Sequence, residues 1–311
     1  MRSLAGSAPL QLPSPLQTWL EQAASAQLEP QGGPKVDFSQ PVGEPALAPP
    51  DSVSWQVFKN PVALLVGGVA AVLMELAEPR VREGVWGHTS FRNDPRPRLQ
   101  RTGLAAMITV YGARSVAEGM IADIRRMHDK VRGTTQGGAA YHANDPELLR
   151  WVQATAAFGF LRAYHTYVRP LPLPARDRYY REGAAAAALY GAEDIPLSEA
   201  DLHALLQTTL PRLEASETVF QFLGIMGRAP LLPLPLRPLQ RLFIRAAVEI
   251  TPPAVRAVLG LDRRHRLGAW EAAPVRFAAS MADRVMVRSS PAVQACLRVG
   301  MPADYLYRRS E

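Results

Sequence analysis

The sequence predicts an all-α protein built as a single helical domain of about nine to eleven helices. Long segments place apolar residues at intervals of three and four, which is the helical period. Hydrophobic residues make up 48% of the 311-residue chain, so a large core can be buried. The 28 prolines cluster between the periodic segments, where they begin or end helices. The alternating pattern of a half-buried strand is rare along the chain.

The N-terminal part differs in composition from the rest. Residues 1–50 are rich in Pro, Gly, Ser, Ala and Gln, and we expect a poorly ordered arm with one short helix at residues 16–27. Such a composition buries too little apolar surface to offset the loss of chain entropy. The helical domain is expected to span residues 51–311. The first residues lack the continuous apolar stretch of a signal peptide, and the single cysteine, Cys296, excludes an intramolecular disulfide; both favour a cytoplasmic protein.

The first helices of the domain are predicted from prolines and apolar runs. Pro61 suits a first helical turn, and the helix is expected to continue to residue 78. Its fourteen-residue apolar run is shorter than the roughly twenty residues that a membrane-spanning helix needs, so we expect a buried core helix and no transmembrane segment. A short helix is predicted at residues 80–86. A long one is predicted from about residue 98 to Arg132, with a break at Gly112.

Caps and breakers locate the later helices. Residues 133–138 form a glycine- and threonine-rich loop, and Asp145 followed by Pro146 marks the start of a helix that extends to about residue 168. Ser198 opens another helix with the pattern of a capping box. The remaining helices are predicted at residues 176–190, 198–210, 214–227, 239–249, 253–258 and 274–287.

The charge of the chain bears on its partners. The formal net charge is +7, and nearly all of the positive charge is arginine. A basic chain can bind nucleic acid. Here the arginines are spread along the sequence, without a dense basic run or interleaved aromatic residues. We therefore expect no nucleic-acid partner.

One helix face combines a histidine with permanent positive charge. The spacing of Arg125, His128 and Arg132 places all three on one face of a continuous helix. A haem needs this combination, because iron binds a neutral imidazole and the propionates pair with arginine. The alternative is a core histidine beside solvated arginines. Apolar residues run alongside at helical intervals, as a porphyrin wall requires: Val116, Met120, Ile121, Ile124, Met127 and Val131.

Two further groups carry candidate chemistry. Arg98, Arg101 and Thr102 place two cations and a hydroxyl one turn apart at the start of the long helix. Loose surface arginines are the alternative interpretation. Glu75 and Glu78 close an apolar helix, where burial raises the pKa of a carboxyl group and can make it a proton-transfer group. Helix capping or surface exposure is the more common role of such a glutamate.

The other histidines show no spacing typical of a helical metal site. His142 is expected to be structural, and His165 and His203 to lie on the surface. His88 precedes the loop that leads to Arg98 and is a second candidate for an active-site role.

Taken together, these motifs resemble the haem-dependent rubber oxygenases (latex-clearing proteins), the MpaB-type oxygenases and their bacterial relatives. Arg98-x-x-Arg101-Thr102 is similar to an Arg-x-x-Lys-Thr segment on the distal side of the haem in rubber oxygenases. The segment around His128 is similar to the one that holds the proximal histidine. The resemblance covers roughly residues 55–270, and the bacterial branch is matched further at residues 141–152, 178–182, 191–198 and 252–261.

The resemblance implies a globin-reminiscent helical fold that binds haem b, with His128 as the axial ligand of the iron. Arg125 and Arg132 would hold the cofactor. Family members of known activity use dioxygen to cleave carbon–carbon double bonds to carbonyls. The implied substrate is therefore an apolar, isoprenoid-like or fatty molecule, bound together with dioxygen.

On the distal side, the resemblance implies that Arg98, Arg101 and Thr102 line the reaction space. Arg101 stands where rubber oxygenases have a lysine. A guanidinium does not deprotonate and is a poor iron ligand, so Arg101 is expected to donate hydrogen bonds only. Glu75 is the candidate for proton transfer.

One departure favours a different class of function. The bacterial branch usually has a histidine where this chain has Gln153. Its loss favours a non-catalytic helical protein that binds haem or a lipid without turnover. The retention of His128, Arg101 and Thr102 favours an enzyme.

Overall fold

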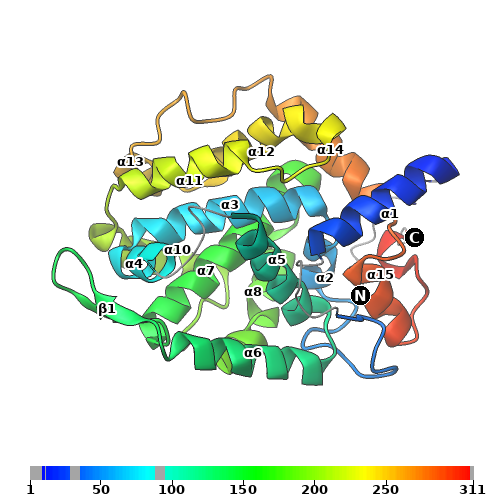
Figure 1. Ribbon diagram of the computed structural model, residues 1–311, viewed down its shortest axis with the longest axis horizontal. Helices are drawn as coiled ribbons and strands as arrows, with labels where there is room; N and C mark the ends of the chain where they lie inside the picture. The colour runs from blue at the N-terminus through cyan, green and yellow to red at the C-terminus, as the bar shows by residue number, and fades with distance from the viewer. Residues whose placement is uncertain (1–8, 11, 29–35, 88–94, 309–311) are drawn as a thin grey trace.

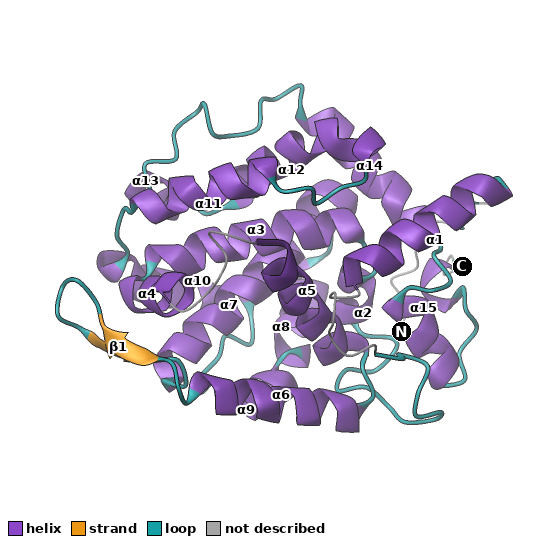
Figure 2. Ribbon diagram, viewed as in Figure 1, coloured by secondary structure: helices purple, strands orange, loops and turns teal. Residues whose placement is uncertain are grey.

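The computed structural model describes residues 9–10, 12–28, 36–87 and 95–308 (Figure 1). The all-α class is confirmed: the described residues form fifteen α-helices and one hairpin of two three-residue strands (Figure 2). There are more helices than predicted, because the segments predicted at residues 98–132 and 176–190 each divide into two and because the helices Val53–Phe58 and Pro291–Arg298 were not predicted.

In the first half of the chain the helices are α1 (Ser14–Leu28), α2 (Val53–Phe58), α3 (Pro61–Ala77), α4 (Pro79–Gly87), α5 (Pro95–Tyr111), α6 (Arg114–His128) and α7 (Pro146–Ala163). The hairpin strands are β1 (Arg132–Thr134) and β2 (Ala140–His142), and a π-helical turn, η2 (Tyr164–Val168), continues α7. The second half forms α8 (Leu173–Glu182), α9 (Ala184–Tyr190), α10 (Glu199–Thr209), α11 (Glu217–Arg228), α12 (Arg237–Ile250), α13 (Pro253–Val258), α14 (Ala272–Arg284) and α15 (Pro291–Arg298). Short 3-10 turns lie at η3 (Leu210–Arg212), η4 (Leu234–Leu236) and η5 (Tyr305–Tyr307).

α3 and α7 form the centre of the molecule and cross in direct backbone contact (Figure 1). Asn60 caps α3 by accepting hydrogen bonds from the first two free amides, and Pro61 occupies the first turn as predicted. Two glycines allow the close approach. A Cβ at Gly67 would stand 2.7 Å from the Gly159 carbonyl oxygen, and a Cβ at Gly159 would stand 2.3 Å from the Gly67 carbonyl oxygen.

Gly159→Ala is expected to destabilise the protein by about 3 kcal/mol or more, because the added methyl group forces two backbones apart. Gly68→Ala is the matched control on α3, since a Cβ there meets only the Phe160 side chain, at 3.7 Å. The control should be neutral or stabilising, because alanine favours a helix over glycine by about 1 kcal/mol. Urea unfolding followed by circular dichroism measures both. Equal stability of the two variants would contradict the close contact.

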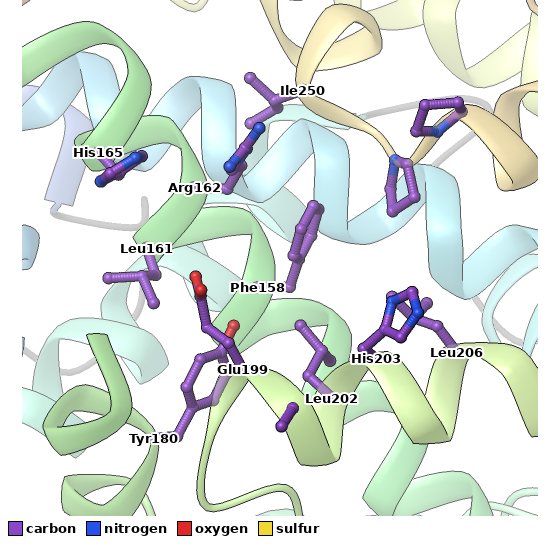
Figure 3. A pocket seen from close by; sticks show the side chains of 13 residues that line it. Phe158, Leu161, Arg162, His165, Tyr180, Glu199, Leu202, His203, Leu206 and Ile250 are labelled. Carbon is purple, nitrogen blue, oxygen red and sulfur yellow. The ribbon is translucent and has the colours of Figure 1, made fainter. Parts of the chain in front are cut away.

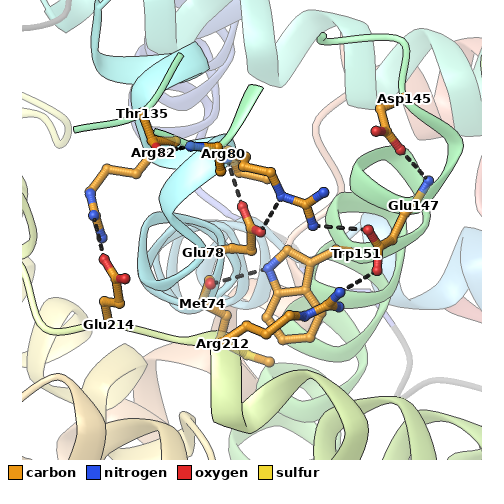
Figure 4. Close-up of polar contacts among 12 residues, drawn as sticks. Met74, Glu78, Arg80, Arg82, Thr135, Asp145, Glu147, Trp151, Arg212 and Glu214 are labelled. Atoms are coloured by element: carbon orange, nitrogen blue, oxygen red, sulfur yellow. Dashed lines mark hydrogen bonds and ion pairs between the residues drawn. The ribbon is translucent and has the colours of Figure 1, made fainter. Parts of the chain in front are cut away.

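The end of α3 is fixed by an ion-pair network (Figure 4). Glu78 is buried at the junction with α4 and accepts a hydrogen bond from Arg80 Nε at 2.8 Å. The other side of the Arg80 guanidinium donates to Glu147 at the start of α7, at 2.9 Å, and Arg212 pairs with the same carboxylate. The network therefore holds α4 and α7 in place around the last turn of α3. Glu78 takes the capping role that was the alternative for this pair of glutamates.

The break predicted at Gly112 is confirmed, since α5 ends at Tyr111 and α6 begins at Arg114. The end of this segment differs from the prediction. α6 stops at His128, and Arg132 lies in β1, so Arg132 does not continue the helix face of His128. The reason is that Arg132 and Gly133 form strand pairs with His142 and Tyr141 of β2. Helical spacing in the sequence gives no sign of this pairing.

Part of the expected N-terminal arm is packed into the core. α1 lies close to the predicted position, and residues 36–50 pack against α15. Arg298 is 1% exposed, and its guanidinium donates to the carbonyl oxygens of Phe38 and Glu44 at 2.7 and 2.9 Å. Two backbone carbonyls thus bind a buried charge across more than 250 residues of sequence.

Among the described helices, none alone has the length and apolar character of a membrane span. α3 and α4 have the necessary length and apolar character only when they are taken together, and the chain bends by 111° between them.

Candidate active site

Glu75 is an isolated carboxyl group in the last turn of α3. Its neighbours along the helix, Met74 and Leu76, are fully buried. Thr155 on α7 approaches Glu75 Oε1 at 3.5 Å, but its single hydroxyl proton is taken by the Val152 carbonyl at 2.9 Å. Burial therefore raises the pKa of Glu75 to about 7, against the opposing charge of Arg98. The group changes charge near neutral pH.

Arg98 connects two parts of the site. It lies in the first turn of α5 and is partly buried. Its positive charge favours the ionised form of Glu75 and, at the same time, the neutral form of His128. The structure therefore brings together three predicted residues from α3, α5 and α6.

His128 ends α6, and its imidazole is only partly exposed. Burial lowers its pKa, Arg98 lowers it further, and Asn144 and Asp129 act in the opposite direction. The ring is therefore neutral at neutral pH, which is the form that binds a metal. Nδ1 is buried without a hydrogen bond.

Asn144 is the polar side chain that acts on the His128 ring. Its amide nitrogen donates to the Arg125 carbonyl at 2.9 Å and to Asp129 Oδ1 at 2.7 Å, so both of its N–H groups are held at the end of α6. Asn144 lies close enough to favour protonation of His128, but the contact falls short of a hydrogen bond, and its Oδ1 is likewise buried without a partner. Two neighbouring residues thus each have a buried atom without a partner, one able to donate and one to accept.

The hairpin explains why sequence reasoning missed Asn144. β1 and β2 carry the chain away from α6 and back, so that residues 142–144 return beside His128. His142 comes within electrostatic reach of the His128 ring, although the sequence predicted only a structural role for it. The glycine-rich loop at residues 133–138, flanked by two short segments, was the available signal for this return.

The other predicted site residues are less closely grouped. Arg125 is exposed and donates to the Leu189 carbonyl at 3.3 Å. Arg132 is exposed on β1, and no side-chain partner binds it within the described part of the chain. Arg101 and Thr102 are exposed on α5, where the charge of Arg101 acts on Arg98. His88 lies outside the described residues.

Gln153, which replaces the usual histidine, lies on α7 and is partly buried. Its Nε2 is 3.4 Å from the position that a Cβ at Gly183 would take. Gln153 therefore faces the junction of α8 and α9, whereas Thr155 of the same helix faces Glu75.

A separate pocket of about 510 Å³ opens on another face of α7 (Figure 3). Its apolar wall includes Phe158 and Leu202, and Arg162 and His165 stand at its edge. His165 Nδ1 accepts a hydrogen bond from the Leu171 amide at 2.9 Å. This histidine is therefore held in the pocket wall, whereas the sequence predicted a surface residue. None of the predicted site residues lines this pocket. No group of three or more His, Cys, Asp or Glu side chains suited to a metal ion is present in the described ranges.

Comparison with known protein families gives one match. The model of one family, described as ER-bound oxygenase mpaB/B′/rubber oxygenase, catalytic domain, matches residues 55–283. No curated protein and no solved structure matches the chain. The matched range begins in α2, ends in α14 and includes Glu75, Arg98 and His128. Because it covers well over half of the 311 residues, the chain belongs to the family of mpaB/B′ and rubber oxygenase catalytic domains and is an oxygenase domain.

Proposed function

We propose that this protein is a haem-dependent oxygenase that uses dioxygen to oxidise or cleave carbon–carbon double bonds of an apolar, isoprenoid-like or fatty substrate. The observation that carries the proposal is the grouping of His128, Arg98 and Glu75 inside an oxygenase catalytic domain. The grouping offers a neutral imidazole, a fixed cation and a carboxyl group that titrates near pH 7. The imidazole can bind iron, the cation can pair with an anion, and the carboxyl group can carry a proton.

The residues fit haem b in its ligand chemistry. A porphyrin supplies four nitrogens, so a haem needs only one strong protein ligand. His128 provides a neutral imidazole whose Nδ1 is buried beside Asn144, which leaves Nε2 for the iron. Arg132 has a guanidinium without a partner in the described residues, whereas Arg125 is engaged at Leu189; Arg132 is thus the better candidate for a propionate. When bound, haem supplies the iron centre at which dioxygen is activated.

Glu75 is proposed to move a proton between its carboxyl oxygen and the bound substrate. A pKa of about 7 allows it to accept and to release a proton at neutral pH. Arg98 favours the ionised form, which is the one that accepts. Removing water from the apolar end of α3 strengthens this interaction.

Asn144 is proposed to hold His128 in the tautomer with the proton on Nδ1. Asn144→Ala is expected to weaken haem binding about 10- to 100-fold, as is usual when the group that orients a ligating histidine is lost. Gln136→Ala, in the exposed turn of the same hairpin, is the control and should bind haem normally. Haemin titration measures affinity. Nitrogen chemical shifts of the His128 ring in the haem-free protein should show a loss of the Nδ1–H tautomer in Asn144→Ala alone. Unchanged shifts and affinity would remove Asn144 from the site.

The alternative function is non-catalytic binding of haem or a lipid, and the glutamine at position 153 favours it. The test is aerobic incubation of the haem-loaded protein with a polyisoprenoid and, separately, an unsaturated fatty acid. Carbonyl products are then captured as hydrazones and identified by mass spectrometry. We expect oxygen-dependent carbonyl products. A folded protein that takes up no haemin would contradict the haem proposal, and a haem-loaded protein without any oxygenated product would support the alternative.

A further inference from the structure

Most of the net positive charge of the chain comes from one segment in its C-terminal third. Residues 228–276 contain nine arginines, no lysine and three carboxylates, which gives +6 out of a total of +7 for the chain. All three carboxylates form ion pairs with arginines of the same segment. The pairs are Glu249 with Arg256 and Arg266, Asp262 with Arg264, and Glu271 with Arg245.

The other five arginines of the segment are exposed, and within the described chain their side chains form no ion pair or hydrogen bond. They are Arg228, Arg237, Arg241, Arg263 and Arg276. Arg237 and Arg241 stand one turn apart on α12 and share a face. The segment therefore presents charge that the protein itself does not neutralise.

Large apolar side chains are exposed in the same segment. Trp270, just before α14, is 80% exposed, Phe277 on α14 is 69% exposed, and Leu234 before α12 is 73% exposed. Trp270 stands two residues before the start of α14, and Phe277 lies in the second turn of that helix. Arg276 adjoins Phe277. Exposed apolar groups of this size, bordered by cations, indicate an interaction surface.

The elements that carry these residues are consecutive in the chain, and α12 packs against α14. We call them the α12–α14 edge and define it as residues 228–280. α12, α14 and the loop between α13 and α14 run along the top of Figure 1. Two ion pairs fasten the loop to α12: Arg245 with Glu271, and Arg266 with Glu249 at 2.7 Å. The edge is thus a fixed part of the fold.

We propose that the α12–α14 edge docks on the surface of an anionic phospholipid bilayer. Trp270, Phe277 and Leu234 enter the interface, and the five unpaired arginines lie against the headgroups. Aromatic rings and arginine stems suit this layer, because each has an apolar body and a polar end. Each arginine near an anionic surface contributes about fivefold in affinity.

A bilayer accounts for the whole edge better than a nucleic acid does. Arginine and aromatic side chains are compatible with either partner. The aliphatic segment around Leu234, with sequence Pro-Leu-Leu-Pro-Leu-Pro-Leu, fits only the bilayer. Its burial among acyl chains is favourable, whereas contact with a polyanion buries no apolar surface. The proposal goes beyond the proposed oxygenase activity and does not depend on haem binding.

The test is co-sedimentation of the full chain with vesicles of phosphatidylcholine, with and without phosphatidylserine. We expect binding only to the vesicles that contain phosphatidylserine, weakened by salt, with a blue shift of tryptophan fluorescence that Trp270→Phe removes. Trp270→Ser combined with Phe277→Ser, and Arg241→Glu combined with Arg276→Glu, should each reduce binding at least tenfold. The matched control is Leu173→Ser combined with Arg181→Glu on α8, where both side chains are exposed; it should bind normally.

Several results would overturn the proposal. One is the absence of binding to phosphatidylserine vesicles at low salt, and another is equal loss in the control variant. A third is tight binding to a nucleic-acid duplex that the charge-reversed variant loses while no vesicle binding is seen. The last is a dimer, detected by light scattering, that Trp270→Ser with Phe277→Ser dissociates in the absence of vesicle binding.

Discussion

The His128→Ala protein is expected to purify without stoichiometric haem, even when the cells are supplied with a haem precursor. The substitution removes the proposed axial imidazole, an effect larger than the roughly 10- to 100-fold that follows from loss of a supporting group. A pyridine haemochrome assay measures the haem content per chain. The unfolding free energy of the haem-free variant should stay within about 1 kcal/mol of the wild type, because the ring makes no hydrogen bond through its buried nitrogen.

Three other described histidines serve as controls. His165 Nδ1 accepts a backbone amide, His203 contacts Gln207, and His142 reaches His128 only through its charge. Alanine at each of these three positions should leave the haem content unchanged. Haem retained in His128→Ala and lost in one of the controls would show that the iron ligand is a different residue.

Glu75→Gln is expected to reduce turnover about 10²- to 10⁴-fold, the usual effect of losing a general acid–base group, while haem binding persists. In the wild type, a base with a pKa of about 7 makes kcat/KM rise with pH until it levels off above pH 7. The residual activity of Glu75→Gln should lack this rise. Initial rates of oxygen-dependent product formation across pH 5 to 9 provide the measurement, and an unchanged profile would exclude Glu75 as the base.

The same substitution should increase stability at alkaline pH. The pKa of Glu75 is about 7 in the folded protein, above the ordinary glutamate pKa of 4.5, so the folded state holds this proton more tightly than the unfolded chain does. The resulting stabilisation is complete below pH 4.5 and is lost as the pH rises through 7. Glutamine resembles the protonated carboxyl group and keeps that stabilisation. At pH 8 the variant should therefore gain up to about 3 kcal/mol over the wild type, with little difference near pH 4.5.

Urea unfolding at the two pH values tests this difference. Glu78→Gln is the matched control on the same helix end, since Glu78 accepts from Arg80 and caps α4. Removing that charge should destabilise the protein at pH 8 rather than stabilise it. A Glu75→Gln variant that loses stability at pH 8 would show that the ionised carboxylate is well solvated or paired.

Local signals in the sequence predicted much of the helical framework. Pro61 and Asp145 begin helices where expected, and Gly112 interrupts one, because these effects depend on residues next to one another. The end of α6 and the place of Arg132 depend on a hairpin that pairs with residues ten positions away. The packing of residues 36–50 on Arg298 involves even more distant parts of the chain, and no local pattern announces it.

In the candidate site, too, local sequence signals indicated some residues, whereas others depend on contacts between distant parts of the chain. Glu75, Arg98 and His128 were predicted as site residues from their residue types and neighbours, and the fold brings Glu75 and His128 each within electrostatic reach of Arg98. Asn144 and Thr155 were not predicted, because their importance comes only from what lies opposite them. The functional roles of all the site residues, including Arg101, Thr102, Arg125 and Arg132, stay predictions.

The glycine contact between α3 and α7 also limits how this protein can be redesigned. Glu75 follows Gly67 by eight residues on α3, about 12 Å along the helix, and Thr155 precedes Gly159 by one turn on α7. Anything that shifts the two helices at their crossing therefore also moves these two side chains relative to each other. A mutant library intended to alter substrate range should keep Gly67 and Gly159 constant and vary α5 and the β1–β2 hairpin instead. Variation at the crossing would mix changes in selectivity with loss of folding, and a screen could not separate the two.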